Sequence, residues 1–331
     1  MLAITWQGII ATPFGYVIDY IYNLIGNYGL TLILFAAAVQ LAMILIQLAR
    51  RPLDKKVKRN SEKMKLIRPI VEKIREDHAD DIEKQNNLIV DLYNKEKISL
   101  LGNFLLSALA GILRFALPFL VLIPIFQVLA QPITYMFHET PETAAAIVRA
   151  MREEAPDLFV HGYNQVVAIA NIQDYAEVIK QAVPEVSEHT LQGLSYNFLG
   201  IDMNVVLGVH VLGKGVWAWD WAHIGALLLP IVYMGRRAYL IFSKMIKSLI
   251  DYSKKKKKAK KLCLTMPKMP NPPLLDLMFL FLSLTAMATV PVSMDLYWLS
   301  SSLFSVLFAK VAKGFLDRKT IKTAVASDTS N

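Results

Sequence analysis

The sequence predicts an all-α polytopic membrane protein with five transmembrane helices, a cytoplasmic helical hairpin and a small extracytoplasmic helical domain. Of its 331 residues, 54% are hydrophobic, whereas a soluble globular chain is usually about 45–50% apolar. The hydrophobic residues gather in a few long runs separated by highly charged stretches, which is the pattern of membrane spans joined by loops. The mean hydropathy of +0.38 agrees with this pattern.

Residues 1–27 are predicted to form an interfacial amphipathic helix. From residue 15 onward, apolar residues recur at helical spacing, but the polar residues between them make the segment too polar to cross a bilayer. Residues 28–48 follow as the first transmembrane helix, because a hydrocarbon core of about 30 Å takes about 20 apolar residues to cross. Gln40 is a polar residue inside this span.

Residues 49–99 are predicted to form the cytoplasmic hairpin. Every third or fourth residue is apolar up to Ile74, the pattern breaks at His78–Asp81, and it resumes from Ile82. Two antiparallel helices joined by a short turn would bury these apolar stripes against each other. The first arm is also rich in Lys and Arg.

Residues 100–135 are predicted to form the second span, which is long and kinked. The run far exceeds the roughly 20 residues that one crossing needs, and Pro118 and Pro124 lie inside it. A single steeply tilted or kinked helix fits this run. Two separate spans are the competing interpretation.

Residues 136–216 are predicted to form an acidic extracytoplasmic segment with short amphipathic helices, including Thr143–Glu154 and Ile172–Ala182. Residues 217–243 then form the third span. Three tryptophans stand near its start and two arginines near its end. Aromatic residues at one interface and cations at the other are typical of a span that runs toward the cytoplasm.

The remainder of the chain is predicted to alternate between basic and apolar segments. Residues 244–273 form a basic cytoplasmic loop, residues 274–309 form the fourth and fifth spans around a turn at Pro291–Asp295, and residues 310–331 form a basic cytoplasmic tail with a disordered polar end. The lysines of the loop suit anionic lipid headgroups, ribosomal RNA or a topology signal. These lysines are Lys254, Lys255, Lys256, Lys257, Lys258, Lys260 and Lys261.

The distribution of charge predicts the topology. Lys and Arg concentrate on the cytoplasmic side of a membrane protein, and they are abundant in residues 49–96, 236–268 and 310–331 but scarce in residues 136–216. Five spans, with the N-terminus outside and the C-terminus in the cytoplasm, satisfy this bias. Two crossings within residues 100–135 would place the acidic segment in the cytoplasm, so the bias favours one.

The sequence gives no indication of catalysis. Cys263 is the single cysteine, the six histidines have no ligand spacing, and no phosphate-binding loop motif is present. We therefore expect no catalytic residues, no metal and no cofactor, and we do not expect an enzyme.

Five stretches of the sequence resemble the YidC/Oxa1/Alb3 membrane protein insertases. They are the first span with the start of the hairpin (Asn27–Asn60), the hairpin exit (Asp91–Lys95), the ends of the extracytoplasmic segment (131–136 and 196–203), and the turn into the last span (Pro291–Phe304). In the last stretch, the residues at the expected positions are Pro291, Leu296, Tyr297, Trp298 and Ser301. The middle stretches are similar to the Gram-positive, clostridia-like branch.

The resemblance implies an insertase and chaperone of the bacterial cell membrane that acts on nascent membrane proteins, together with the Sec translocon, the ribosome and anionic lipids, without a specific nucleic-acid site. Members of this family are similar in having a polar groove that is open to lipid and cytoplasm. Such a groove makes physical sense, because a translocating segment cannot leave its backbone polar groups unsatisfied in hydrocarbon. No nucleotide hydrolysis is implied.

Four residues are candidates for the groove: Gln40, Arg114, Tyr297 and Trp298. Many relatives carry a cation in the first span, where this chain has Gln40, so Arg114 is a candidate replacement. Each has a simpler alternative. Gln40 could form an ordinary bond between helices, Arg114 could reach the headgroups, and the two aromatic residues could be interfacial.

Three other functions compete with insertion. A secondary transporter would show internal repeats, and none is visible in this sequence. A membrane-anchored enzyme would need a cluster of catalytic side chains in one soluble region. A specialised paralogue that acts as a membrane scaffold remains an alternative that the sequence does not separate from an insertase.

Overall fold

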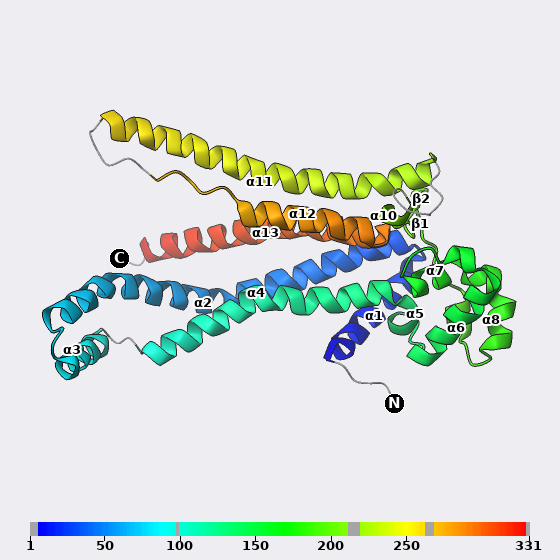
Figure 1. Ribbon diagram of the computed structural model, residues 1–331, viewed down its shortest axis with the longest axis horizontal. Helices are drawn as coiled ribbons and strands as arrows, with labels where there is room; N and C mark the ends of the chain where they lie inside the picture. Colours follow the sequence, from blue (N-terminus) through cyan, green and yellow to red (C-terminus); the bar gives the residue numbers. More distant parts are fainter. Residues whose placement is uncertain (1–5, 97–98, 211–218, 262–267, 329–331) are drawn as a thin grey trace. The chain divides into compact units, whose positions relative to one another are not determined.

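The computed structural model describes residues 6–96, 99–210, 219–261 and 268–328, most of which are helical (Figure 1). In chain order, the elements are α1 (Trp6–Ile25), α2 (Tyr28–Asp77), α3 (Ile82–Lys95), α4 (Leu100–Ala130), α5 (Pro132–Tyr135), α6 (Pro141–Glu154), the 3-10 helix η1 (Pro156–Leu158), α7 (Asn164–Asn171), the 3-10 helix η2 (Ile172–Tyr175), α8 (Ala176–Ala182), α9 (Glu188–Leu191), β1 (Asn197–Phe198), β2 (Ile201–Asp202), α10 (Leu207–His210), α11 (Trp221–Lys261), α12 (Leu274–Thr289) and α13 (Val292–Asp328). The predicted all-α fold class is confirmed.

Four helices in the described ranges, α2, α4, α11 and α13, are long and apolar enough to cross a membrane. The prediction of a polytopic membrane protein is therefore confirmed. Helix α12 is apolar but has 16 residues, so it is about 24 Å long, less than the roughly 30 Å of a hydrocarbon core. The count of five spans depends on this helix and stays a prediction.

The chain divides into two compact units. The first unit comprises Met1–Gln40 and Pro124–Asn331, and the second unit comprises Leu41–Ile123. In the first unit, α11 packs against α12, α13 and β2. A hydrophobic core of this unit consists of Ile201, Val205, Leu207, Ala226 and Val292. This core packs residues 201–207, which precede α11, against the start of α13.

The segment between α5 and α11 folds around its own small core. Its buried side chains include Ile147, Met151, Ile169, Ile172 and Ile179. The predicted helix Thr143–Glu154 is confirmed as α6, which begins two residues earlier because Thr140 caps it by accepting a hydrogen bond from the Thr143 N–H at 3.1 Å. The second predicted helix, at residues 172–182, is divided into η2 and α8.

A β-hairpin, β1–β2, lies where the sequence analysis expected helices alone. Its two-residue turn consists of Leu199 and Gly200, with φ angles of 54° and 82°. Positive φ at both positions is typical of the turns that match the twist of a hairpin. The indole N–H of Trp221 donates to the Leu199 carbonyl oxygen at 2.9 Å, so the turn is bound to the first turn of α11.

Replacing Leu199 by asparagine should stabilise the protein by about 1 kcal/mol, because a left-handed backbone is costly for leucine but tolerated by asparagine. Leucine contributes little packing in return, since 74% of its surface is exposed. The midpoint of thermal unfolding in detergent would rise. Leu199→Ala is the matched control, because it removes the same apolar surface and keeps the backbone cost; an equal rise for both variants would contradict the explanation.

Helix α1 packs against the same segment rather than standing alone. The Asp19 carboxylate lies 3.4 Å from His189 Nε2 and 3.8 Å from His138 Nε2, and the Tyr16 ring stacks on His138 at 3.8 Å between ring centroids. Burial lowers the pKa of His138, and the nearby Asp19 charge opposes this shift in part. Polar and aromatic contacts therefore fix one face of the helix that was predicted to be interfacial.

The second unit contains the helical hairpin. Helix α2 ends at Asp77 and α3 begins at Ile82, with the break where the apolar pattern stops. The buried stripe consists of Ile67 and Val71, flanked by Met64, Ile89, Leu92 and Tyr93. Asp81 caps α3 by accepting a hydrogen bond from the Lys84 N–H at 2.9 Å.

Helices continue through several of the predicted boundaries, so these boundaries are not helix ends and stay predictions of membrane position. The first span and the first arm of the hairpin are one 50-residue helix, α2. Residues 100–130 form one helix, α4, which agrees with the interpretation of this run as a single helix. The predicted basic loop is helical up to Lys261, the predicted turn at Pro291–Asp295 is helical from Val292, and the predicted disordered tail is helical to Asp328. Lys, Arg, Ala and Leu are strong helix formers, so charge alone does not end a helix. The predicted span start at Trp217, and residues 1–5, 97–98, 262–267 and 329–331 of other predicted segments, lie outside the described residues.

Candidate functional site

The amide of Gln40 lies between helices of the first unit. Its Nε2 donates a hydrogen bond to Ser301 Oγ, on α13, at 2.6 Å. Tyr297, one turn earlier on α13, is buried, is also a hydrogen-bond partner of Ser301, and packs against Phe35 with ring centroids 6.0 Å apart. Ser301 therefore brings together two of the predicted groove residues, Gln40 and Tyr297.

Two arginines of α11 lie in the same unit, next to serines. Arg236 donates to the Ser302 hydroxyl and, at 3.1 Å, to the Ser302 carbonyl oxygen. Arg237 donates to Tyr233 OH at 3.0 Å and to Ser283 Oγ, on α12, at 2.9 Å. We call this group, which connects α2, α11, α12 and α13, the polar cluster. It consists of Gln40, Tyr233, Arg236, Arg237, Ser283, Tyr297, Ser301 and Ser302.

The sequence analysis missed the part that Arg236 and Arg237 play, because it treated them as the cationic end of the third span. A signal was present in the sequence. Apolar and aromatic residues continue directly after the two arginines, from Tyr239 to Phe242, so the arginines interrupt an apolar run instead of ending it. A charge inside such a run usually faces a cavity or a polar partner.

The polar cluster combines two cationic side chains with neutral hydrogen-bond partners. Neither guanidinium has a carboxylate within 4.0 Å among the described residues. Both are half-buried, and their partners are hydroxyl groups and a carbonyl oxygen, which are neutral. Guanidinium groups present several N–H donors in a fixed plane and suit carboxylates and backbone carbonyls. The arrangement therefore offers positive charge and hydrogen-bond donors to a polar guest.

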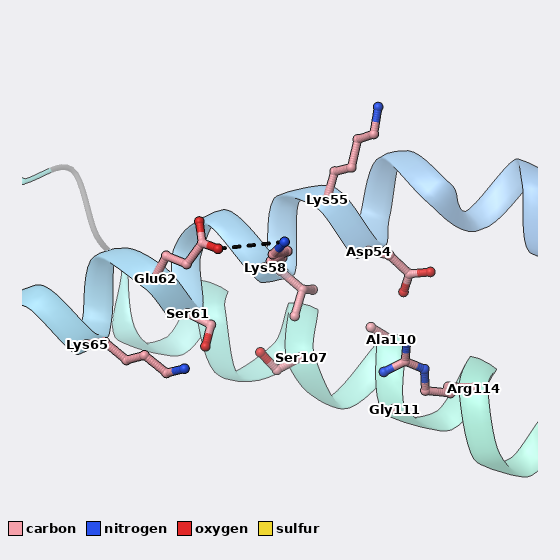
Figure 2. A pocket seen from close by; sticks show the side chains of 11 residues that line it. Asp54, Lys55, Lys58, Ser61, Glu62, Lys65, Ser107, Ala110, Gly111 and Arg114 are labelled. Carbon is pink, nitrogen blue, oxygen red and sulfur yellow. Dashed lines mark ion pairs between the residues drawn. The ribbon is translucent and has the colours of Figure 1, made fainter. Parts of the chain in front are cut away.

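The other two predicted groove residues, Trp298 and Arg114, are not members of the polar cluster as defined above. Trp298 follows Tyr297 on α13 and is half-buried. Arg114 belongs to the second unit, where it is exposed and lines a pocket between α2 and α4 (Figure 2).

Asp295, in the first turn of α13, is fully buried, and neither of its carboxylate oxygens has a hydrogen-bond partner in the described part of the chain. The sequence analysis placed it in a turn.

The lysines of the predicted basic loop are on the final turns of α11. Lys254 to Lys258 and Lys260 are exposed, and Lys261 is the last residue of the helix. Within the first unit, this end of α11 and the end of α13 lie on the side away from α5–α8 (Figure 1). The lysines are therefore presented by a helix that extends directly from a candidate span.

A comparison with known protein families identifies the chain. The family model described as “60Kd inner membrane protein” matches residues 20–319. The chain belongs to this family. The matched range includes the whole polar cluster, the pocket around Arg114 and the lysines of α11. Together with the apolar helices, membership in the 60Kd inner membrane protein family assigns the chain to the bacterial cell membrane as a multi-pass protein.

Individual relatives of the 60Kd inner membrane protein family align with part of the chain. The membrane protein insertase YidC of Nitratidesulfovibrio vulgaris (strain DP4) is 37% identical over 121 residues, which are 37% of this chain and 19% of the relative. The same-named proteins of Brucella suis (35% over 121 residues, 37% and 17% of the two chains) and Pseudomonas aeruginosa (33% over 117 residues, 35% and 17%) are also similar. The match thus spans about a fifth of the length of these relatives. No solved structure matches the chain significantly.

Proposed function

We propose that the chain is a membrane protein insertase and chaperone that passes nascent hydrophobic segments into the bilayer. The observation that carries the proposal is the polar cluster. Its two arginines lie on α11, a candidate span, and have no carboxylate within 4.0 Å in the described part of the chain. Polar groups inside candidate spans are costly and therefore usually functional. The relatives that are named membrane protein insertases support the same activity.

The physical basis is a lower barrier for polar polypeptide. A hydrophilic segment that crosses hydrocarbon leaves its backbone N–H and C=O groups without partners, at several kcal/mol for each group. Hydroxyl, amide and guanidinium groups of the cluster would supply partners through part of this path. The apolar span of the substrate then partitions into lipid, which supplies the driving force without nucleotide hydrolysis or a catalytic step.

The proposal also includes the membrane topology of the chain, its partners and the bacterial branch of the family that it resembles. Lysines at the end of α11 and the basic arm of α2 support a cytoplasmic location for these ends, with the N-terminus outside. Nascent membrane proteins are the substrates, with the Sec translocon, the ribosome and anionic lipids as partners. The resemblance of residues 131–136 and 196–203 supports the Gram-positive, clostridia-like branch, although the relatives named above come from other bacteria.

Reconstitution tests the activity directly. The purified full-length protein is placed in liposomes, and insertion of a small two-span substrate with short polar tails is measured by protease protection of its tails. Protection above that of empty liposomes is expected, with no requirement for ATP. Protection equal to that of empty liposomes, with the protein folded and correctly oriented, would contradict the proposal.

Crosslinking tests where the substrate passes. A photoreactive residue at position 40 is expected to crosslink to a stalled nascent chain, because Gln40 belongs to the polar cluster. Position 30 is the matched control, since Leu30 lies on the same helix about 15 Å along its axis from Gln40 and has 44% of its surface exposed. Crosslinks at position 30 without crosslinks at position 40 would exclude the cluster as the substrate path.

A further inference from the structure

The second unit contains a pocket of about 550 Å³ between one face of α2 and one face of α4 (Figure 2). On α4, the lining residues Ser107, Ala110, Gly111 and Arg114 follow the spacing of a single helix face. Three of these four side chains are small, so the two helices leave room between them. Asn60, on α2, donates a hydrogen bond to Asn103, on α4, which joins the helices.

The charges of the pocket are mostly positive and only partly neutralised. The α2 face contributes Asp54, Lys55, Val57, Lys58, Ser61, Glu62 and Lys65. Asp54 pairs with Arg50 at 3.2 Å and Glu62 with Lys58 at 3.9 Å, so both acids already have a cation. Among the described residues, Lys55, Lys65 and Arg114 have no carboxylate within 4.0 Å.

The free cations do not all face the same way. Lys65 and Arg114 extend into the space between the helices, near its two ends, whereas Lys55 points away from α4 (Figure 2). The hydroxyl groups of Ser61 and Ser107 lie between those two ends. Together these groups suit an anion that accepts several hydrogen bonds, and phosphate is such an anion.

Arg114 also lies at a chemical boundary. It is the one charged residue of the sequence between Leu100 and Ala130. It lines the pocket together with Asp54 of α2. Asp54 lies just after Arg50, where the apolar run of α2 ends and charged residues begin. In a membrane protein, such a change from apolar to charged residues occurs at the level of the lipid headgroups.

An apolar surface borders the pocket on α4. Leu117, Val121 and Leu122 follow Arg114 by three, seven and eight residues, so they form a stripe that continues the pocket face toward the apolar end of α4. Leu122 is 40% exposed, and Leu117 and Val121 are half-buried. A cationic pocket beside a partly exposed apolar stripe suits a ligand that is anionic at one end and apolar at the other. A free phosphate ion would not use the stripe, and neither would an acidic peptide without apolar residues.

We propose that the pocket between α2 and α4 binds the phosphate headgroup of an anionic phospholipid. Arg114 binds the phosphate, Ser107 donates to it, and Lys65 extends the site for a larger headgroup. The acyl chains lie along the stripe that Leu117, Val121 and Leu122 form. This site is independent of the polar cluster and of the lysines on α11.

The binding of phosphatidylglycerol tests the proposal. Short-chain phosphatidylglycerol and phosphatidylcholine are titrated into the full-length protein in detergent, and bound lipid is counted by native mass spectrometry. We expect the wild type to prefer phosphatidylglycerol, and Arg114→Gln to weaken its binding about fivefold or more, as expected for the loss of one cation next to an anionic lipid. Lys73→Gln is the matched control, because Lys73 is exposed on α2 and does not line the pocket.

A second variant keeps every charge and fills the space. A side chain at Gly111 would meet no other atom within 4 Å at its Cβ, so Gly111→Leu should fold normally and occupy the pocket. We expect it to reduce phosphatidylglycerol binding as strongly as Arg114→Gln. Unchanged binding in both variants, or an equal loss in Lys73→Gln, would overturn the proposal in favour of general surface attraction.

Competition separates the possible ligands. Inorganic phosphate and a polyglutamate peptide are added to the complex of wild-type protein and phosphatidylglycerol. We expect neither to displace the lipid at concentrations where a second anionic phospholipid does. Full displacement by inorganic phosphate would assign the site to a free phosphate, and displacement by the peptide would assign it to acidic polypeptide; either result would overturn the lipid assignment.

Discussion

Replacing Gly15 by alanine is expected to loosen α1 from the rest of the first unit and to lower stability by about 3 kcal/mol, at the upper end of the cost of overpacking. A Cβ at this position would overlap the carbonyl oxygen of Tyr135 and lie 2.6 Å from its carbonyl carbon. Both atoms belong to the backbone at the end of α5, so no side chain can rotate to relieve the clash. The helix must move away, and its contacts with His138 and His189 must lengthen.

The unfolding midpoint in detergent and limited proteolysis near Gly26 measure this effect. Gly235→Ala is the matched control, because Gly235 is also inside a helix but has no atom within 4 Å of an added Cβ. Alanine there should stabilise α11 by up to about 1 kcal/mol through helix propensity. If both variants behaved alike, the close approach of α1 and α5 would not be what makes glycine necessary at position 15.

The sequence was sufficient for features that depend on periodicity and composition. The apolar runs predicted α2, α4, α11 and α13, and the break at His78–Asp81 predicted the two arms of the hairpin. Such features depend on local patterns that a single sequence contains. Helix ends were predicted poorly, because the lysines after Phe242 continue α11 to Lys261. A change from apolar to charged residues marks the edge of a membrane but not the end of a helix.

Contacts between distant segments could not be predicted in the same way. Gln40 was identified from resemblance, but its partner Ser301 is 261 positions away in the chain. Likewise, no local pattern indicates that Leu199 adopts a positive φ or that the turn binds Trp221. Tertiary packing decides these details. The same limitation explains why Ser302 was not predicted as the hydrogen-bond partner of Arg236.

Arg236→Gln is expected to reduce insertion of substrates with acidic tails by about tenfold or more, since hydrogen bonds to a charged group contribute roughly 1.5–3 kcal/mol. Glutamine can still donate to Ser302, so the contact between α11 and α13 persists. Hydrogen bonds between membrane helices average about 0.6 kcal/mol, so the unfolding midpoint should change little. Protease protection in proteoliposomes, with matched substrates that carry acidic or neutral tails, measures the effect.

Two further variants distinguish a substrate contact from a structural one. Arg236→Lys keeps the charge and should retain much of the insertion of acidic tails, although it lacks the planar donors of arginine. Ser302→Ala keeps the cation and removes its hydroxyl partner, which frees the guanidinium for a guest and should leave insertion of acidic tails at least as efficient as in the wild type. A structural role predicts the opposite order, with Ser302→Ala as damaging as Arg236→Gln and with acidic and neutral tails affected equally. The order of the variants therefore shows whether the cation of the polar cluster acts on the passing chain or only holds α11 against α13.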